Sequence, residues 1–239
     1  MKTSVAIIMP VLNEAAILES RITDLRQLQT WAELCIVDGG SADSTVALAR
    51  TITPHVLCCQ PGRALQMNRG AEEAHAEYLL FLHGDTVLPA DFEAFIAALG
   101  NARPFWGFFP VQLVPGGRVL TVVERCINWR SRLTAVATGD QAIFVRRELF
   151  ERLSGYAAIP LMEDVELSKR LRQFAQPFRW GSAVQTSSRR WQQRGVVPTV
   201  LQMWDLRLRY FLGASPQHLH ARYYGKTVKP MESNNNECR

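Results

Sequence analysis

The amino-acid sequence predicts an α/β protein built around a mostly parallel sheet, and two observations support this class. Strand-like apolar runs alternate with helical stretches through the first hundred residues, the β-α-β-α order of parallel sheets with right-handed crossovers. Three of these runs also lead into an acidic residue, at Glu14, Asp38 and Asp85. Because the carboxyl ends of parallel strands meet at one edge of the sheet, these acids predict a site there for a polar or metal-bridged ligand.

Local patterns define the elements of the first half. Apolar runs of strand length predict strands near residues 4–10, 34–38, 55–59 and 78–83, and the stretches between and after them predict helices near 15–29, 43–51, 64–75 and 89–100. Pro89 is expected to open the last helix, since proline suits a first helical turn. A chain of 239 residues can bury most of its apolar surface in one large domain, with or without an appendage.

The alternation loosens after residue 100. Residues 104–114 are aromatic and strand-like, and a turn is expected at residues 115–117 because they read Pro-Gly-Gly. Residues 118–133 mix apolar positions with four arginines and predict either a helix over the sheet or a mobile lid. A strand is expected at 142–145, and helical spacing returns from Glu163. The sequence therefore predicts an α/β core with an irregular second half.

A wide apolar stripe at helical spacing marks the C-terminal region. Its positions are Val197, Val200, Leu201, Trp204, Leu208, Phe211 and Leu212, and it is widened by Met203, Leu206 and Tyr210. We expect this helix to pack on the core or on a second copy of the chain in a homodimer, and the alternative is peripheral contact with a membrane. Residues 229–239 include three consecutive asparagines and are expected to be a disordered tail.

The charge balance is moderately basic, with a net charge of +5 and a pI near 9.1. The excess lies mostly near the C-terminal end, where six arginines and Lys226 face only Asp205. Such a cluster suits the phosphates of a nucleotide, a nucleic acid or an anionic lipid, and a solvated basic face is the alternative. Sparse aromatic residues in this region and the lack of a named motif argue against nucleic acid.

Cysteine usage and hydropathy indicate a cellular compartment. Five cysteines without a C-x-x-C pair argue against a disulfide framework or a zinc cluster and favour a reducing cytoplasm. Cys35, Cys58 and Cys59 are expected to be small core hydrophobes. The first strand leaves no room for a signal peptide, and no run of about eighteen apolar residues occurs. We expect a cytoplasmic protein, with attachment to the inner face of the membrane as the alternative.

Two motifs follow the first two strands. Residues 10–14, P-V-L-N-E, place the Glu14 carboxylate near a helix start, where the macrodipole favours it. Residues 38–41, D-G-G-S, let the backbone approach a ligand closely and leave Asp38 at a strand tip, where its carboxylate suits N–H groups of uracil or guanine. The first motif alone also fits an ordinary helix start, and the second a tight turn.

Three further motifs carry charge. In residues 83–85, H-G-D, a buried strand presents Asp85, and a divalent cation beside a diphosphate is the natural partner of such an acid, although a hydrogen-bonded structural aspartate is the alternative. Glu163 and Asp164 stand at a helix start, where the helix dipole keeps a carboxylate ionised. A general base must be ionised, so the pair suits that role, although a helix cap fits the spacing equally well. Arg190 and Trp191 offer a guanidinium fork and an indole face, which suit a phosphate and a sugar ring.

Taken in order, these motifs resemble the inverting glycosyltransferases of family 2, which have the GT-A fold. The family pattern is P-x-x-N-E, a D-G-S-x-D-x-T loop, a D-x-D-like element, an E-D pair and often an R-W pair. This chain has them at residues 10–14, 38–45, 83–85, 163–164 and 190–191, so the resemblance covers roughly residues 3–195. It is closest to a small bacterial subgroup without membrane spans, in which residues 62–71 also have a counterpart.

The resemblance implies a domain layout and a site. Residues 1–195 would form a GT-A-like, Rossmann-type domain, with a nucleotide-sugar-binding half at 1–100, an acceptor and catalytic half at 101–195, and an amphipathic helical extension at 196–228. Asp164 would be the catalytic base beside Glu163, and Asp85 would hold Mg²⁺ or Mn²⁺. The positions implied for the nucleotide sugar are Pro10, Glu14, Asp38, Gly40, Arg63, Gln66, Asn68, His83 and Gly84, and those for the acceptor or diphosphate side are Gly139, Asp140, Arg190 and Trp191.

The implied reaction moves a sugar from a UDP- or GDP-sugar to a hydroxyl of an unidentified acceptor, with inversion. Two departures from the family pattern stand out: His83 replaces the first acid of the D-x-D element, and Gly39 stands where many relatives have a second aspartate. The alternatives are a catalytically impaired sugar-nucleotide-binding or scaffolding protein and a nucleotidyltransferase, although the latter's glycine-rich loop is missing after the first strand. A dehydrogenase is the weakest alternative, because G-x-G-x-x-G is absent there.

Overall fold

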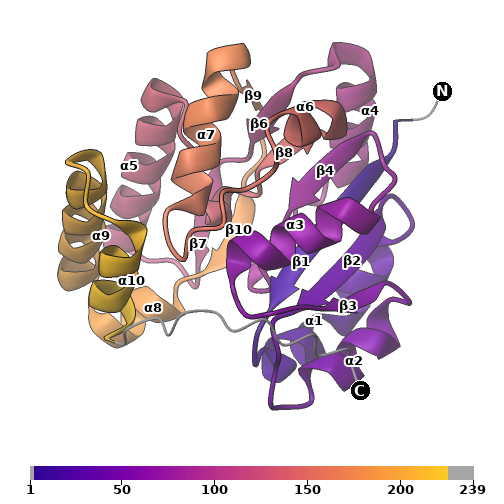
Figure 1. Cartoon of the computed structure of the whole chain (residues 1–239), viewed down its shortest axis with the longest axis horizontal. Coiled ribbons are helices and arrows are strands. Elements are labelled where there is room, and N and C mark those ends of the chain that lie inside the picture. The colour runs from indigo at the N-terminus through magenta and orange to yellow at the C-terminus, as the bar shows by residue number, and fades with distance from the viewer. Residues whose placement is uncertain (1–2, 226–239) are drawn as a thin grey trace.

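A seven-stranded sheet forms the core of the computed structural model, which describes residues 3–225 (Figure 1). The strand order is β3-β2-β1-β4-β8-β6-β9, with β1 (Val5–Val11), β2 (Glu33–Asp38), β3 (Val56–Cys58) and β4 (Tyr78–Phe81) parallel to one another. β8 (Phe144–Arg146) runs antiparallel to β4 and β6 (Trp106–Phe108), and β9 (Phe178–Arg179) is parallel to β6. The predicted α/β class with a mostly parallel sheet is confirmed.

Helices cover both faces of this sheet because successive residues of a strand point to opposite sides. In β1, the alternate residues from Val5 to Val11 pack with α1 (Ala15–Leu28), α2 (Thr45–Ile52) and α4 (Phe92–Ala102). Ala6 and Ile8 instead pack with α3 (Arg63–Glu73), α6 (Arg147–Arg152) and α7 (Glu163–Phe174), which lie in front of the sheet in Figure 1. Burial on both faces explains why the central strands read as continuous apolar runs.

A smaller sheet of β5 (Thr86–Val87), β10 (Val184–Ser187) and β7 (Val111–Val114) lies beside the first, with β10 in the middle. The stretch 104–114, expected to be a single strand, therefore supplies β6 to one sheet and β7 to the other. Pro110, which has no N–H for a strand ladder, lies at the change of sheet. The stretch 118–133 forms a continuous helix, α5 (Arg118–Thr134), whose Glu124 and Asn128 side chains accept hydrogen bonds from Leu113 N and Val111 N of β7.

Two local expectations need correction. α4 begins at Phe92 rather than at Pro89, whose carbonyl oxygen accepts a hydrogen bond from Phe92 N in the preceding turn. Cys35 is buried as expected, but Cys59 is half-buried and Cys58 is disulfide-bonded, so neither is a plain core thiol. No helix within residues 3–225 combines the length and the apolar character needed to cross a bilayer.

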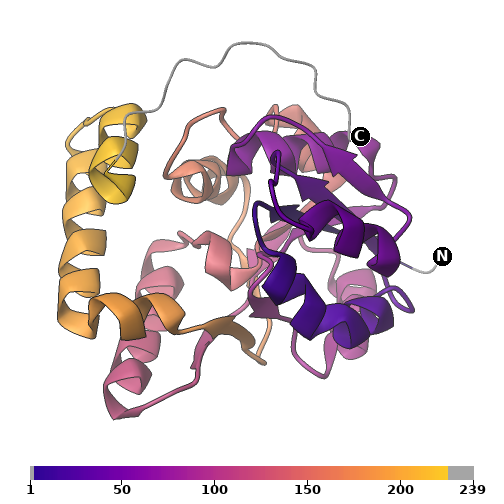
Figure 2. The ribbon, with the colours of Figure 1, turned by 90° about the horizontal axis from the view of Figure 1, so that it is seen from below.

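Three helices at the C-terminal end gather on the side of the molecule opposite β3, as both views show (Figures 1 and 2). They are α8 (Arg189–Arg194), α9 (Val196–Phe211) and α10 (Pro216–Tyr224). Leu206 of α9 and Leu219 of α10 are buried with Met162 and Val165, so these helices pack against the start of α7. The tail expected at residues 229–239 lies outside the described part of the chain, as does Lys226.

Candidate active site

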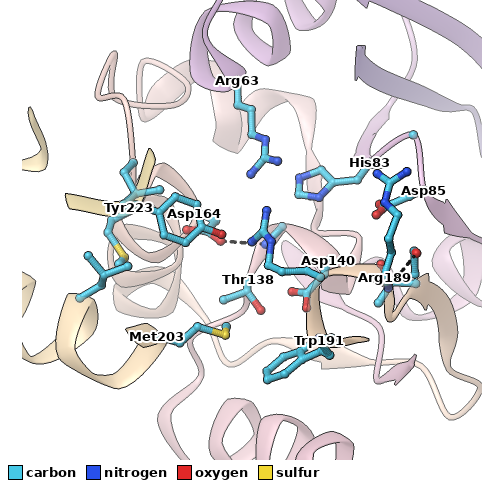
Figure 3. Close-up of a pocket in the computed structure, with 18 of the residues that line it drawn as sticks. Arg63, His83, Asp85, Thr138, Asp140, Asp164, Arg189, Trp191, Met203 and Tyr223 are labelled. Carbon is cyan, nitrogen blue, oxygen red and sulfur yellow. Dashed lines mark hydrogen bonds between the residues drawn. The ribbon is translucent and has the colours of Figure 1, made fainter. Parts of the chain in front are cut away.

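A cleft of about 480 Å³ opens at the carboxyl ends of β1 and β4 and extends to the C-terminal helices (Figure 3). β1 and β4 are neighbours in the sheet, but the chain leaves β1 towards β2 on the opposite side, so the cleft lies at a topological switch point. Its other walls come from the start of α3, from β7 and β10, from the short 3-10 helix Gly139–Gln141 with Thr138 before it, from the start of α7, and from α8 to α10. Segments far apart in sequence thus meet around one space.

The cleft brings together twelve of the sequence-predicted residues: Pro10, Glu14, Arg63, His83, Gly84, Asp85, Gly139, Asp140, Glu163, Asp164, Arg190 and Trp191. Figure 3 shows Asp164 on one side of the space and His83 and Asp85 on the other, with Arg63 pointing between them. Donor-side and base candidates therefore face each other across one cavity.

Four predicted residues, Asp38, Gly40, Gln66 and Asn68, do not line this cleft. The buried Asp38 carboxylate shapes its own loop, since one oxygen accepts hydrogen bonds from Gly40 N and Ser41 N, both at 2.8 Å. The Gln66 amide bridges two strands by donating to Val11 O and Val37 O. Asn68 exchanges two hydrogen bonds with the Tyr156 backbone. In this structure these side chains support the walls of the site.

Two carboxylates mark the sheet end of the cleft. Burial, followed by the nearby Asp85 charge, raises the pKa of Glu14 to about 7. One Glu14 oxygen is buried without a hydrogen-bond partner among the described residues. The carboxylate packs so closely on Gly84 that a Cβ there would lie 2.2 Å from this oxygen. Because this pair of acids is left undercompensated, a cation would stabilise it.

His83 adds a neutral ring beside these acids. Burial, together with the charges of Arg63 and Arg190, lowers its pKa to about 3, so the imidazole is uncharged at neutral pH. A Cβ on Gly139 would lie 2.5 Å from two atoms of the ring, so glycine is needed for this close approach. The histidine at the end of β4 therefore packs against Gly139, whose N–H donates a hydrogen bond to Asp164.

The acid pair stands at the start of α7, where Met162 adopts a left-handed conformation with φ 70°. One Asp164 oxygen accepts a hydrogen bond from Gly139 N at 2.8 Å and the other from Val165 N at 2.7 Å. Burial raises the Asp164 pKa despite these bonds, and burial plus the Asp164 charge raises the pKa of Glu163 to about 7. Asp164 is thus held in place by two backbone hydrogen bonds, and burial makes its carboxylate a stronger proton acceptor than an exposed aspartate.

Several lining residues were not singled out as site residues from the sequence. They include Leu113, Thr138, Met162, Arg189, Met203, Arg207 and Tyr223. Arg189 and Arg207 belong to the basic cluster noted above, and Met203 to the apolar stripe, but neither pattern shows which side chains turn inward. The Arg190 guanidinium lies over the Tyr223 ring, 5.1 Å from its centroid, so α10 also helps to position a cation of the cleft.

The sequence relatives of this chain are glycosyltransferases. Residues 6–119 match the family model described as Glycosyl transferase family 2. The chain is similar to a PGL/p-HBAD biosynthesis glycosyltransferase of Mycobacterium bovis, with 34% identity over 168 residues that cover 63% of this chain and 62% of the relative. It is also similar to glycosyltransferase AglJ of Haloferax volcanii, with 37% identity over 84 residues that cover 34% of this chain and 27% of the relative. The match thus spans less than two thirds of either relative.

Solved structures share the fold at low sequence identity. S. aureus TarS 1-349 aligns with a TM-score of 0.62 and 17% identity, over 78% of this chain and 61% of that one. Mannosyltransferase PcManGT from Pyrobaculum calidifontis, solved with GDP-Man and Mn²⁺, aligns with a TM-score of 0.59 and 21% identity, over 96% of this chain and 66% of that one. Residues 6–119 therefore match glycosyl transferase family 2, the sequence relatives are glycosyltransferases, and the chain shares a GT-A-like fold with the solved structures.

Proposed function

We propose that this protein transfers a sugar from a nucleotide-diphosphate sugar to an acceptor hydroxyl with inversion, and that Asp164 is the general base. The observation that carries the proposal is the position of Asp164, which lies in the cleft opposite His83 and Asp85 and accepts a hydrogen bond from Gly139 N. Solved neighbours support the donor class, since S. aureus TarS was solved with UDP-GlcNAc and the Pyrobaculum enzyme with GDP-Man.

The proposed mechanism divides the cleft into two ends. At the sheet end, Arg63, Arg189 and Arg190 supply positive charge for a diphosphate, and Arg63 and Arg189 interact electrostatically with Glu14. At the other end, Asp164 removes the proton of an acceptor hydroxyl as its oxygen attacks the anomeric carbon, and the carbon–oxygen bond to the diphosphate breaks. A single displacement of this kind inverts the configuration at that carbon.

The residues present fit a divalent cation at the sheet end. Mg²⁺ and Mn²⁺ are commonly held by one or two carboxylates together with substrate phosphates and water, and Asp85 and the unpartnered oxygen of Glu14 are of this type. Among the described residues no cluster of three or more metal-ligating side chains exists, so the donor phosphates would have to complete the coordination. Such an ion supplies charge neutralisation for the leaving diphosphate. Structural neighbours bind Mn²⁺ with GDP-Man and Mg²⁺ with UDP.

The variant Asp164→Asn tests the base assignment. We expect it to bind UDP- or GDP-sugars with nearly unchanged affinity, because the side-chain size and one of the two accepted backbone hydrogen bonds are kept, while sugar transfer or slow donor hydrolysis falls by at least about 10²-fold. Calorimetric titration with and without Mn²⁺ measures binding, and release of nucleoside diphosphate measures turnover. Glu148→Gln, an exposed acid on α6, is the matched control and should change neither. Unchanged turnover in Asp164→Asn would contradict the assignment, and donor binding without turnover in the unmodified protein would favour a binding or scaffolding role.

A further inference from the structure

Two helices on the C-terminal side carry exposed apolar stripes on their outer faces. In α5 the stripe is Val119, Val122, Trp129 and Leu133, and in α9 it is Val197, Leu201, Trp204, Leu208, Phe211 and Leu212. The exposed fraction of these ten residues ranges from 59% to 77%. The spacing follows helical periodicity in each case, so each stripe lies along one side of its helix. We refer to these ten residues as the outer apolar face.

The inner sides of both helices are already used. Leu120, Val123 and Ile127 of α5 meet Val196, Val200 and Met203 of the α9 region around Trp191. Figures 1 and 2 both show α5 beside α8 and α9 at the same end of the molecule. The side of a surface helix that faces water normally carries polar residues, whereas α5 and α9 carry apolar residues on the buried and on the exposed side. Packing within the described part of the chain does not bury the outer apolar face.

The charges around the outer apolar face have one dominant sign. Segments 118–134 and 189–225, which contain α5 and α8 to α10, hold ten arginines and only two acids, Glu124 and Asp205. Four of these arginines line the cleft and two pair with Asp205, which leaves the four of α5, of which Arg118, Arg125 and Arg132 are exposed. Both acids are engaged within the chain: Glu124 accepts from Leu113 N, and Asp205 forms ion pairs with Arg209 and Arg222. A surface that combines exposed tryptophans, aliphatic residues and uncompensated arginines matches the interface of a bilayer that contains anionic lipids.

We propose that the outer apolar face docks on the surface of an anionic membrane. The apolar side chains enter the boundary between headgroups and acyl chains, and the flanking arginines meet the lipid phosphates. A second copy of the chain fits less well, because two such faces would bring the exposed arginines of both copies together, and the two acids of each copy are already engaged within the chain. The inference does not rest on the transferase activity, since none of these ten side chains lines the cleft.

Co-sedimentation of the full-length chain with vesicles tests the docking surface. Vesicles of phosphatidylcholine alone should bind weakly, and addition of phosphatidylglycerol should increase binding at least about tenfold, with loss of the increase at high salt. The double variant Trp204→Gln/Leu208→Gln should lower binding to the acidic vesicles by at least about tenfold, because two deeply inserted side chains are lost. Arg118→Gln/Arg125→Gln, which removes two exposed arginines of α5, should reduce mainly the dependence on phosphatidylglycerol.

Controls separate docking from misfolding and from self-association. Phe105→Gln changes an exposed aromatic residue outside the outer apolar face and should bind vesicles as the unmodified protein does. Circular dichroism and donor binding should be unchanged in all variants. Sedimentation velocity without lipid should show a monomer. A dimer that Trp204→Gln/Leu208→Gln dissociates, or equal binding to both kinds of vesicle by all variants, would overturn the proposal.

Discussion

Glu163 and Asp164 are adjacent carboxyl groups at one buried helix start, so they titrate as a pair rather than as two isolated acids. Each disfavours ionisation of the other, and burial raises both pKa values. A raised pKa makes a carboxylate a better proton acceptor near neutral pH but leaves more of it protonated under acidic conditions. Activity that depends on the ionised base is therefore lost as the pH falls through the titration of this pair.

The pH profile of Glu163→Gln follows from this coupling. In the unmodified protein we expect the transfer rate to rise with pH as this coupled pair ionises and then to level off. Replacement by glutamine removes the like charge, so the Asp164 pKa falls and the acidic limb moves to lower pH by about one unit. Rates measured from acidic to mildly basic pH check this, with exposed Glu93→Gln as the control. An unmoved limb would contradict the coupling.

Residue roles are only partly readable from the sequence. The acids after β1 and β4 could be predicted to meet because strand ends share one edge of the sheet, whereas the acids at the start of α7 could be expected in the same site only from the family resemblance. Asp38 and Gln66 satisfy the same motifs, yet their polar atoms bond to Gly40, Ser41 and two strand carbonyls. A motif specifies residue types, whereas the direction of each side chain depends on local hydrogen bonds that spacing does not reveal.

Among the elements, α3 presents Arg63 to the cleft, and its position is determined by a close contact at Gly70. A Cβ on Gly70 would lie 2.5 Å from Ile8 Cγ2 of β1 and 3.0 Å from Val37 Cγ2 of β2. Any larger residue must therefore push the helix away from two branched side chains in the middle of the sheet. Arg63 at the start of the helix would move with it.

The substitution Gly70→Ala should consequently destabilise the protein although alanine favours helices. We expect the free energy of unfolding to fall by about 1–3 kcal/mol, as overpacking costs, and donor affinity to fall as well. Urea unfolding and calorimetry measure the two effects. Gly181→Ala is the matched control, because no heavy atom lies within 4 Å of its added Cβ, and its effect should stay within about 0.5 kcal/mol. Equal stability of the two variants would argue against the close contact.

Elements of the first half could be predicted because each strand and helix there repeats a regular pattern. The second half could not be predicted to the same extent, and residues 104–114 show why. Their apolar character is continuous, but β6 pairs with β8 and β9 while β7 pairs with β10. Which sheet a short strand joins depends on partners more than thirty residues away, and hydrophobic patterning alone does not contain that information.

At the scale of the whole molecule, the C-terminal helices complete the cleft rather than forming a separate appendage. Met203, Leu206 and Arg207 of α9 and Tyr223 of α10 line it. Leu206 and Leu219 are buried against Met162 and Val165, next to the acid pair. The sequence indicated an amphipathic helix here but could not show which partner its buried side meets, because α7 lies far away along the chain.

Leu206 and Leu208, two positions apart on α9, lie on different sides of the helix, one buried and one exposed. Leu206→Ala should lower the free energy of unfolding by about 2–5 kcal/mol and reduce sugar transfer, since the buried side chain supports the start of α7. Leu208→Ala, at an exposed position, should leave both nearly unchanged and weaken vesicle binding. Urea unfolding, turnover and co-sedimentation distinguish the two. Loss of transfer in Leu208→Ala alone would contradict the division.

Under the proposed function, the central position of Arg63 couples donor binding to the protonation of the nearby carboxyl groups. Its guanidinium attracts Glu14, Glu163 and Asp164, and thereby favours their ionised forms. A diphosphate that engages the guanidinium weakens this attraction, so the carboxyl groups take up protons as the donor enters. Donor affinity then improves as the pH falls, whereas the readiness of the base improves as it rises. The pH of maximal turnover is therefore a compromise between donor binding, which is favoured at lower pH, and ionisation of the base, which is favoured at higher pH.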